Sequence, residues 1–275
     1  MGSLAGAVRG LPVLVAFLLL QGCAPPAQRA DAMAAGHGWT RTLVRGTDFR
    51  HVVYANGISD PARPLHVYLE GDGSPYVDPW TPAPDPTPRR PVMLPLMALD
   101  ASPSVYVGRP CYFGLARDPP CTPNDWTLGR FSERVVESLA QAIEQLRRER
   151  GGGQVEIYGH SGGGALAVLL AARLPGVLRV VTLAGNLDPD AWAKHHGYSL
   201  LTGSLNPSRR GALPASVVQL HIAGAEDATV PPWMVDRASR QLGAATIEVL
   251  PNVTHSCCWR ERWGALMEAA AGTRL

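Results

Sequence analysis

The sequence predicts an α/β fold in which one mostly parallel central sheet is flanked by helices within a single domain. Short β-branched and aliphatic runs alternate with longer Ala/Leu/Arg-rich segments, an alternation typical of parallel strands connected by helices. The 275 residues are 46% hydrophobic and 17% charged, a composition sufficient for one large core and unlike that of disordered chains. The sequence shows no internal repeat and no second domain boundary.

Seven segments have the length and the β-branched or aliphatic content of strands. They span residues 49–54, 65–69, 104–107, 154–158, 178–183, 217–223 and 246–250. Four further segments are predicted as helices, at residues 132–150, 162–173, 233–241 and 260–271. The first helix has an apolar stripe that includes Val135, Leu139 and Ile143, and this spacing predicts packing against the sheet.

A proline-rich segment separates the second and third predicted strands. It runs from residue 72 to residue 95, with prolines at 75, 79, 82, 84, 86, 88, 91 and 95. Proline lacks the backbone N–H that helices and sheets require. The segment is therefore expected to be a surface excursion without regular structure.

The amino terminus has the features of an export signal. Arg9 precedes an apolar run at residues 11–20, which has the length of a signal-peptide core and is too short to span a membrane. The run ends in Leu20-Gln21-Gly22-Cys23 and resembles the lipobox of bacterial lipoproteins, which implies that residues 1–22 are a signal peptide and that Cys23 is lipidated. Residues 23–47 are then expected to be the lipidated cysteine and a flexible tether, because the stretch after Cys23 is rich in Ala, Pro and Gln. The remaining residues, 48–275, are expected to form the single folded domain.

Export also decides how the cysteines are interpreted. The lipobox resemblance places the protein in the bacterial cell envelope, anchored to a membrane by acyl chains, whereas an ordinary cleaved signal peptide would leave it secreted. Because these compartments are oxidising, the cysteines after Cys23 are expected to pair. Pairing of Cys111 with Cys121 is favoured among the three possible connectivities, because a short loop is easily bridged. Cys257 and Cys258 are adjacent and could pair with each other only through a strained ring.

Composition argues against several classes of partner. Lys plus Arg total 25 against 23 for Asp plus Glu, so the chain lacks the positive charge expected of a nucleic-acid-binding protein. The cysteines do not have the spacing of a metal site, and no cofactor or metal is expected. A metal site at Glu70 and Asp72 is an alternative that lacks further clustered carboxylates.

The chemistry concentrates in Gly159-His160-Ser161-Gly162-Gly163, between a predicted strand and an Ala/Leu-rich helix. A Gly-x-Ser-x-Gly motif in this setting is typical of a nucleophile elbow, a sharp turn that exposes the serine oxygen. The flanking glycines lack the Cβ atoms that would collide as strand and helix converge. Ser161 is therefore the candidate nucleophile. A glycine-rich turn without catalytic meaning is the alternative.

A serine nucleophile needs a histidine to accept its proton and a carboxylate to orient that histidine. Asp227 lies in the loop after the predicted strand 217–223 and is the preferred acid. Asp188, after the preceding strand, is the alternative, and Glu226 is a weaker candidate. His255 lies between the last predicted strand and the last helix and is the candidate base, whereas His160 in the elbow is expected to be a buried packing residue.

These residues resemble the α/β-hydrolase superfamily, and in particular its serine esterases and lipases, from about residue 48 to residue 270. In that family the order along the chain is Ser, acid, His, as it is for Ser161, Asp227 and His255. The resemblance implies an oxyanion hole formed by the N–H of Gly162 and by an N–H of the loop that follows residues 65–69. That loop reads Glu70-Gly71-Asp72-Gly73 where many members have His-Gly, and its expected donor is Asp72 or Gly73.

The expected function is that of a serine hydrolase. Ser161 would attack an acyl carbonyl, His255 would transfer the proton, and water would hydrolyse the acyl-enzyme. The resemblance favours a small or lipid-like ester as substrate, although peptidases, thioesterases and acyltransferases share the fold. A non-catalytic envelope lipoprotein that uses the fold as a binding module is the competing class. Residues 192–213 are expected to form a short cap over the site.

Overall fold

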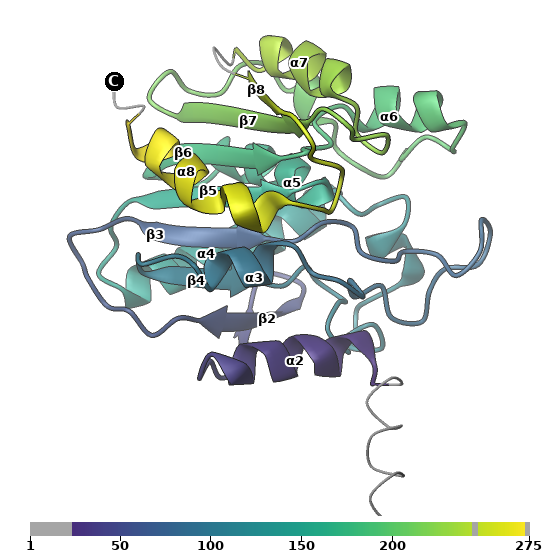
Figure 1. Ribbon diagram of the computed structural model, residues 1–275. Helices are drawn as coiled ribbons and strands as arrows, with labels where there is room; N and C mark the ends of the chain where they lie inside the picture. The colour runs from purple at the N-terminus through teal and green to yellow at the C-terminus, as the bar shows by residue number, and fades with distance from the viewer. Residues whose placement is uncertain (1–23, 244–246, 273–275) are drawn as a thin grey trace, which may run out of the picture.

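The computed structural model describes residues 24–243 and 247–272, and its centre is a sheet covered by helices on both faces (Figure 1). Within these residues the sheet has eight strands in the order β1-β2-β4-β3-β5-β6-β7-β8. The strands are β1 (Thr42–Arg45), β2 (Arg50–Ala55), β3 (Leu65–Leu69), β4 (Ser104–Val107), β5 (Val155–His160), β6 (Val177–Leu183), β7 (Val218–Gly224) and β8 (Ile247–Leu250). β2 is antiparallel to both β1 and β4, and every other pairing is parallel. The prediction of a mostly parallel sheet flanked by helices is confirmed.

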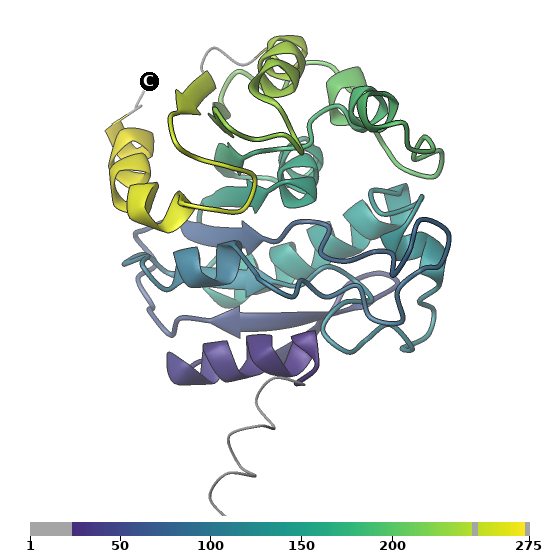
Figure 2. The ribbon, with the colours of Figure 1, turned by 45° about the vertical axis from the view of Figure 1, so that its right-hand side comes forward.

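The helices form a layer on each face of the sheet (Figure 2). One layer contains α3 (Met93–Met97) and α8 (Trp259–Gly272), and the other contains α4 (Glu133–Glu149), α5 (Gly162–Ala171) and α7 (Pro232–Gln241). Every residue of α5 is buried, because this helix is apolar all round and lies between the sheet and its neighbours. The short elements η2 (Pro123–Trp126), α6 (Pro189–His196) and η3 (Pro207–Arg209) lie in the connections.

The prediction of a flexible tether at residues 23–47 is wrong, because most of this segment is folded. Residues Pro26–Gly36 form helix α2, and its Ala27, Ala30 and Ala34 are buried. Alanine has the highest helix propensity, and prolines are tolerated in the first helical turn. The three alanines lie three and four residues apart, so they share the face that packs against the rest of the fold. The folded unit therefore begins well before residue 48.

A strand also precedes the predicted boundary. β1 pairs with β2 between Thr42–Arg45 and the start of Arg50–Ala55, which places it at one edge of the sheet. The predicted signal peptide, residues 1–22, and the predicted lipidation site, Cys23, lie outside the described residues. In the described part of the chain, no helix is long and apolar enough to cross a membrane.

The proline-rich segment is irregular up to the start of α3, as predicted, but only part of it is a surface excursion. Trp80 near its tip is 87% exposed, whereas Thr87 is fully buried and its hydroxyl accepts a hydrogen bond from the N–H of Phe113. Met93 and Leu94 are also buried. The segment therefore folds back onto the loop that follows β4.

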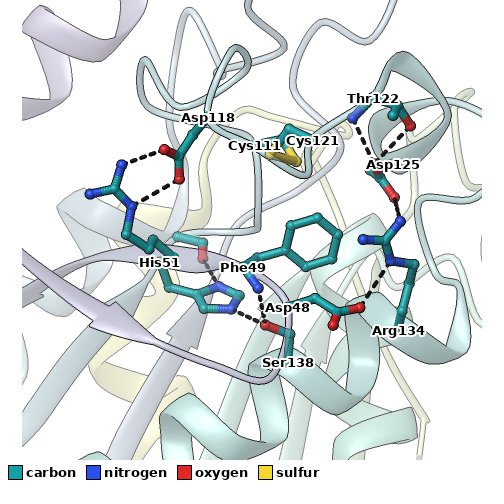
Figure 3. Close-up of a disulfide and its surroundings, with 12 residues drawn as sticks. Asp48, Phe49, His51, Cys111, Asp118, Cys121, Thr122, Asp125, Arg134 and Ser138 are labelled. Carbon is teal, nitrogen blue, oxygen red and sulfur yellow. Dashed lines mark hydrogen bonds and ion pairs between the residues drawn. A yellow bond between two sulfur atoms is a disulfide. The ribbon is translucent and has the colours of Figure 1, made fainter.

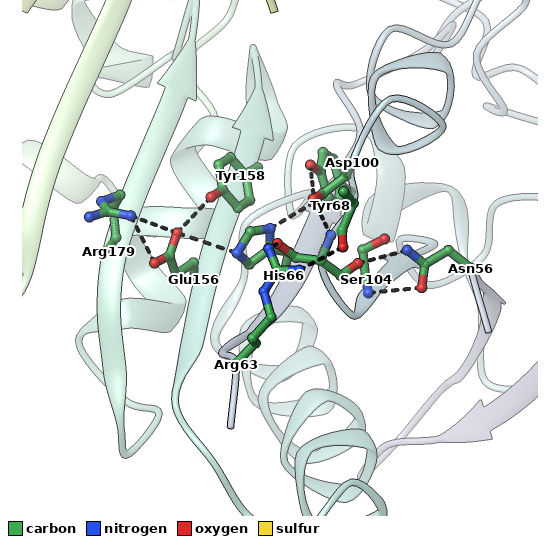
Figure 4. A network of polar contacts seen from close by, with 11 residues as sticks. Asn56, Arg63, His66, Tyr68, Asp100, Ser104, Glu156, Tyr158 and Arg179 are labelled. Carbon is green, nitrogen blue, oxygen red and sulfur yellow. Dashed lines mark hydrogen bonds and ion pairs between the residues drawn. The ribbon is translucent and has the colours of Figure 1, made fainter. Parts of the chain in front are cut away.

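A row of largely buried polar side chains crosses the sheet near the amino-terminal ends of the parallel strands (Figure 4). His66 of β3 and Arg179 of β6 flank Glu156 of β5 in register. Arg179 Nη1 lies 2.8 Å from both carboxylate oxygens of Glu156, and His66 Nδ1 lies 2.7 Å from Asp100 Oδ2. Buried charges are tolerated when they are paired in this way.

Candidate active site

A strained turn between β5 and α5 presents Ser161. Its backbone has φ 53° and ψ −119°, a conformation that non-glycine residues rarely adopt. A Cβ added to Gly159 would collide with the carbonyl oxygen of Gly163, and one added to Gly163 would collide with that of Leu69. The glycines are therefore required for the close approach of strand, turn and helix.

Three side chains from the carboxyl-terminal side of the sheet form one hydrogen-bonded chain. His255 Nε2 lies 3.0 Å from Ser161 Oγ, and His255 Nδ1 lies 2.8 Å from Asp227 Oδ2. The Asp227 side chain is fully buried, and its Oδ1 accepts hydrogen bonds from the N–H groups of Thr229 and Val230, both at 2.8 Å. Since these N–H groups hold one carboxylate oxygen, the other is directed at His255. The structure thus brings together the three residues singled out from the sequence.

Asp188 and Glu226, the other candidate acids, do not take part in the hydrogen bonds that link Ser161, His255 and Asp227. Asp188 caps the amino end of α6, where its Oδ1 accepts a hydrogen bond from the N–H of Ala191 at 3.1 Å. The same oxygen accepts a hydrogen bond from Asn206 Nδ2 at 2.8 Å. Glu226 is exposed beside Asp227. The alternative assignments of the acid are therefore not supported.

His160 supports the position of His255, a role that the sequence analysis missed. Its Nε2–H donates to the carbonyl oxygen of His255 at 2.7 Å, and Trp259 Nε1–H donates to the same oxygen at 3.0 Å. Burial, reinforced by the neighbouring His255, lowers the pKa of His160 to about 3, so this imidazole stays neutral. Its place inside the elbow, one residue before Ser161, is the signal that points to it.

The loop after β3 approaches the other side of Ser161. A Cβ added to Gly71 would lie 3.3 Å from Ser161 Cβ, and the Asp72 carboxylate lies directly over Gly162. Gly73 instead packs against Pro86 and Pro88, further along the proline-rich segment. Among the described residues, neither the N–H of Gly162 nor that of Asp72 donates a hydrogen bond. Both donors are therefore available beside the serine.

Glu70 connects this loop to the start of α3. It is buried, and its Oε2 accepts hydrogen bonds from the N–H groups of Val92 and Met93, both at 3.0 Å. Burial raises the pKa of the Glu70 carboxyl. The Asp72 carboxylate is occupied by arginines, so the two acidic side chains are not arranged as metal ligands. In the described residues, no group of three or more His, Cys, Asp or Glu side chains is placed to hold a metal ion.

Neither a protein-family profile nor a curated protein sequence matches this chain. Solved structures do match it. The esterase from Pyrococcus furiosus shares 12% sequence identity with a TM-score of 0.59, over 86% of this chain and 91% of that chain. A bacterial membrane phospholipase A shares 13% identity with a TM-score of 0.58, over 94% and 97%. An alpha-beta serine hydrolase homologue from Coxiella burnetii shares 16% identity with a TM-score of 0.52, over 86% and 97%. The chain has the α/β-hydrolase fold.

The α/β-hydrolase fold here carries two disulfides in its loops. Cys111 pairs with Cys121, with the Cα atoms 5.7 Å apart, and Cys257 pairs with Cys258. The first bridge closes the loop after β4, and Asp118 within that loop forms an ion pair with Arg50 of β2 (Figure 3). The favoured pairing of Cys111 with Cys121 is the one present in the structure.

The region predicted as a cap over the site contains α6. Trp192 Nε1–H and His196 Nε2–H both donate to the carbonyl oxygen of Thr229, at 2.9 and 2.8 Å. Thr229 also binds the triad acid candidate through its N–H. This region is thus attached to the loop that holds Asp227.

Proposed function

We propose that this chain is a serine hydrolase that cleaves carboxylic esters through an acyl-enzyme at Ser161. The observation that carries the proposal is the chain of hydrogen bonds from Ser161 Oγ through His255 to Asp227, at 3.0 and 2.8 Å. A nucleophile, a base within hydrogen-bond reach and a group that orients the base are the requirements for this chemistry.

The proton positions follow from the partners of His255. In the neutral imidazole, Nδ1–H donates to the Asp227 carboxylate and Nε2 accepts the hydrogen bond of the Ser161 hydroxyl. As Ser161 Oγ forms a bond to the acyl carbon, its proton moves to His255, which then donates it to the leaving oxygen. Water attacks the acyl-enzyme by the same route, with His255 as base, and releases the acid.

In this mechanism the N–H groups of Gly162 and Asp72 bind the oxyanion that forms on the substrate carbonyl. Gly162 directly follows Ser161, and the contact of Gly71 with Ser161 favours Asp72 over Gly73 as the loop donor. Donors of this kind act mainly on the transition state, because the charge they bind is absent from the substrate.

A small or lipid-like acyl ester is the proposed substrate class. Support comes from the similarity in fold to an esterase and to a membrane phospholipase A. A short-chain p-nitrophenyl ester and the matching p-nitroanilide, compared with one enzyme preparation, separate ester from amide hydrolysis.

We also propose that the protein is anchored to a membrane of the bacterial cell envelope through a lipidated Cys23. The apolar run before Leu20-Gln21-Gly22-Cys23 supports this. Cys23→Ser should move the protein from the membrane fraction to the soluble fraction and abolish incorporation of a palmitate analogue. Absence of label on the wild-type protein would leave secretion as the better explanation.

Labelling with a fluorophosphonate tests the catalytic proposal without requiring the substrate. The wild-type protein should be labelled at Ser161, and Ser161→Ala should remove the label and lower ester turnover by about 10⁴-fold or more. Ser216→Ala, at an exposed serine, is the matched control and should be labelled like wild type. A wild-type protein that takes no label would instead favour a binding module on the same fold.

A further inference from the structure

A buried cluster of one carboxylate and two guanidinium groups lies beside the candidate oxyanion site. Asp72 Oδ1 forms an ion pair with Arg109 Nη1, and Asp72 Oδ2 lies 2.8 Å from Arg130 Nη1. The two arginine side chains are 1% and 4% exposed. With two guanidinium groups and one carboxylate the cluster has a net charge of +1, whereas a single ion pair would have a net charge of zero.

The cluster touches the amino end of α5. A Cβ added to Gly162 would collide with Asp72 Oδ1 and would lie 3.1 Å from Arg109 Nη1. Gly162 directly follows Ser161, and its N–H is the first donor of the helix. The carboxylate of Asp72 is therefore close to the place where a substrate oxygen would gain negative charge.

A carboxylate at that place opposes the reaction unless its charge is offset. Burial alone would raise the pKa of Asp72, but Arg130 and Arg109 outweigh it and lower the pKa to about 2. The carboxylate thus stays ionised throughout the pH range in which the enzyme would work. Like charges held close together in a site of low dielectric repel strongly.

Both arginines have partners besides Asp72. Arg130 Nε–H donates to the carbonyl oxygen of Thr127 at 2.6 Å. The Arg109 guanidinium lies 5.1 Å from the ring centre of Tyr112 and 5.3 Å from that of Phe131, and its Nη2–H donates to the carbonyl oxygen of Arg130 at 3.1 Å. The Tyr112 hydroxyl donates to the backbone carbonyl oxygen of Asp72 at 2.9 Å. Asp72 is therefore fixed through its side chain and its backbone by residues of two other loops.

We infer that Arg109 and Arg130 are positioning residues for the oxyanion site: they hold the Asp72 loop against Ser161 and reverse the sign of its local charge. This inference rests on the proposed serine-hydrolase function and assigns a role to two residues outside the triad. Their charge acts on the transition state and not on the bound ester, because only the transition state carries the extra negative charge.

The variant Arg109→Gln should lower kcat by about 100-fold with KM changed by less than about threefold, the range seen when one oxyanion donor is removed. Its remaining charges, Asp72 and Arg130, cancel. Adding Asp72→Asn to this variant keeps the backbone N–H and restores a net charge of +1, so the double variant should recover at least about tenfold in kcat.

Arg179→Gln is the matched control, because the Arg179 side chain is only 11% exposed and also pairs with a carboxylate, but lies at the amino-terminal ends of the strands (Figure 4). It should lower the thermal midpoint and leave kcat and KM unchanged. If Arg109→Gln does not fold, Arg130→Gln with and without Asp72→Asn provides the same comparison. Circular dichroism establishes folding for each variant.

The decisive result is the rescue. If folded Arg109→Gln and its double variant with Asp72→Asn have the same kcat, the charge of Arg109 does not act on the oxyanion site and the inference is wrong. Fluorophosphonate labelling of wild-type Ser161 is measured in parallel. Absence of that label overturns the proposed function itself, so the two failures are distinguished.

Discussion

Three buried histidines should make the fold sensitive to mild acid. His51 and His221 are fully buried and His160 is nearly so. Burial lowers the pKa of His51 and of His221 to about 4, and burial with the nearby His255 lowers that of His160 to about 3. In the unfolded chain each would titrate near the usual histidine pKa of about 6.5.

The direction of the effect follows from proton binding. Below about pH 6.5 the three histidines bind protons in the unfolded chain but not in the folded protein. The free energy of unfolding therefore falls as the pH falls. The loss ends near the folded-state pKa values. Between about pH 6.5 and pH 5 each histidine contributes a loss of about 1.6 kcal/mol, so that the three together contribute about 5 kcal/mol. A typical domain has only about 5 to 15 kcal/mol of stability.

The contribution of a single histidine is isolated by a variant. His51 Nδ1–H donates to the carbonyl oxygen of Gly108 at 3.0 Å, and its Nε2 accepts from the Ser138 hydroxyl at 2.9 Å (Figure 3). His51→Gln should lower stability near pH 7, because these hydrogen bonds are altered, but should reduce the dependence of stability on pH by about 1 kcal/mol per pH unit.

Urea unfolding followed by tryptophan fluorescence at several pH values measures this dependence. His37→Gln, at an exposed position, is the control and should leave the dependence unchanged. The raised pKa of Glu70 acts in the opposite direction, so the comparison is between wild type and variant and not with an absolute slope. Parallel curves for wild type and His51→Gln would mean that His51 is protonated in the folded protein, and the reasoning would fail.

The other predictions concern the site and the loops. Asp227→Asn should lower kcat/KM for a short-chain ester by up to about 10⁴-fold. Asp188→Asn should leave kcat/KM within about twofold of wild type and lower the free energy of unfolding by at most about 1 kcal/mol, because Asp188 caps α6. A larger loss of kcat/KM in Asp188→Asn than in Asp227→Asn would make Asp188 the acid. Trp259→Phe removes one of two donors to the backbone of the base and should lower kcat by about fivefold, the equivalent of about 1 kcal/mol, and an unchanged kcat would mean that one donor suffices. Replacing Cys111 and Cys121 together by serine should lower the free energy of unfolding by about 3 kcal/mol in chemical denaturation, with Ser161 still labelled; an unchanged midpoint would indicate that the loop is ordered without the bridge.

The elbow could be predicted from the sequence because its signal is local. An aliphatic strand segment, the glycines that flank Ser161 and an Ala/Leu-rich helix segment follow one another along the chain. Each of these has a residue pattern that can be recognised in the sequence. Asp227 and His255 could be placed because the carboxyl ends of parallel strands meet at one edge of a sheet. Their order along the chain then limited the choice to a few residues.

Arg109 and Arg130 could not be found in this way. They come from connections after β4 and before α4, and their contact with Asp72 depends on how irregular loops fold over one another. Such loops have no periodic pattern. Helix α2 was missed for a different reason: its segment is rich in both Ala and Pro, and composition alone does not distinguish a linker from a helix whose prolines lie at its start.

Helix α2 also determines how far an anchored protein would extend from its membrane. The helix begins at Pro26, so only two residues would separate it from a lipidated Cys23, and an extended chain covers about 3.5 Å per residue. Ala27, at the start of the helix, lies next to Gly114 in the loop after β4, which is the loop that contains Arg109 beside the candidate site. The start of α2 would therefore be held within about 10 Å of the point of attachment, and so would the loop after β4 that packs on it. A protein anchored through so short a linker would act on esters in or next to the bilayer that holds it and would not reach substrates in an opposite membrane.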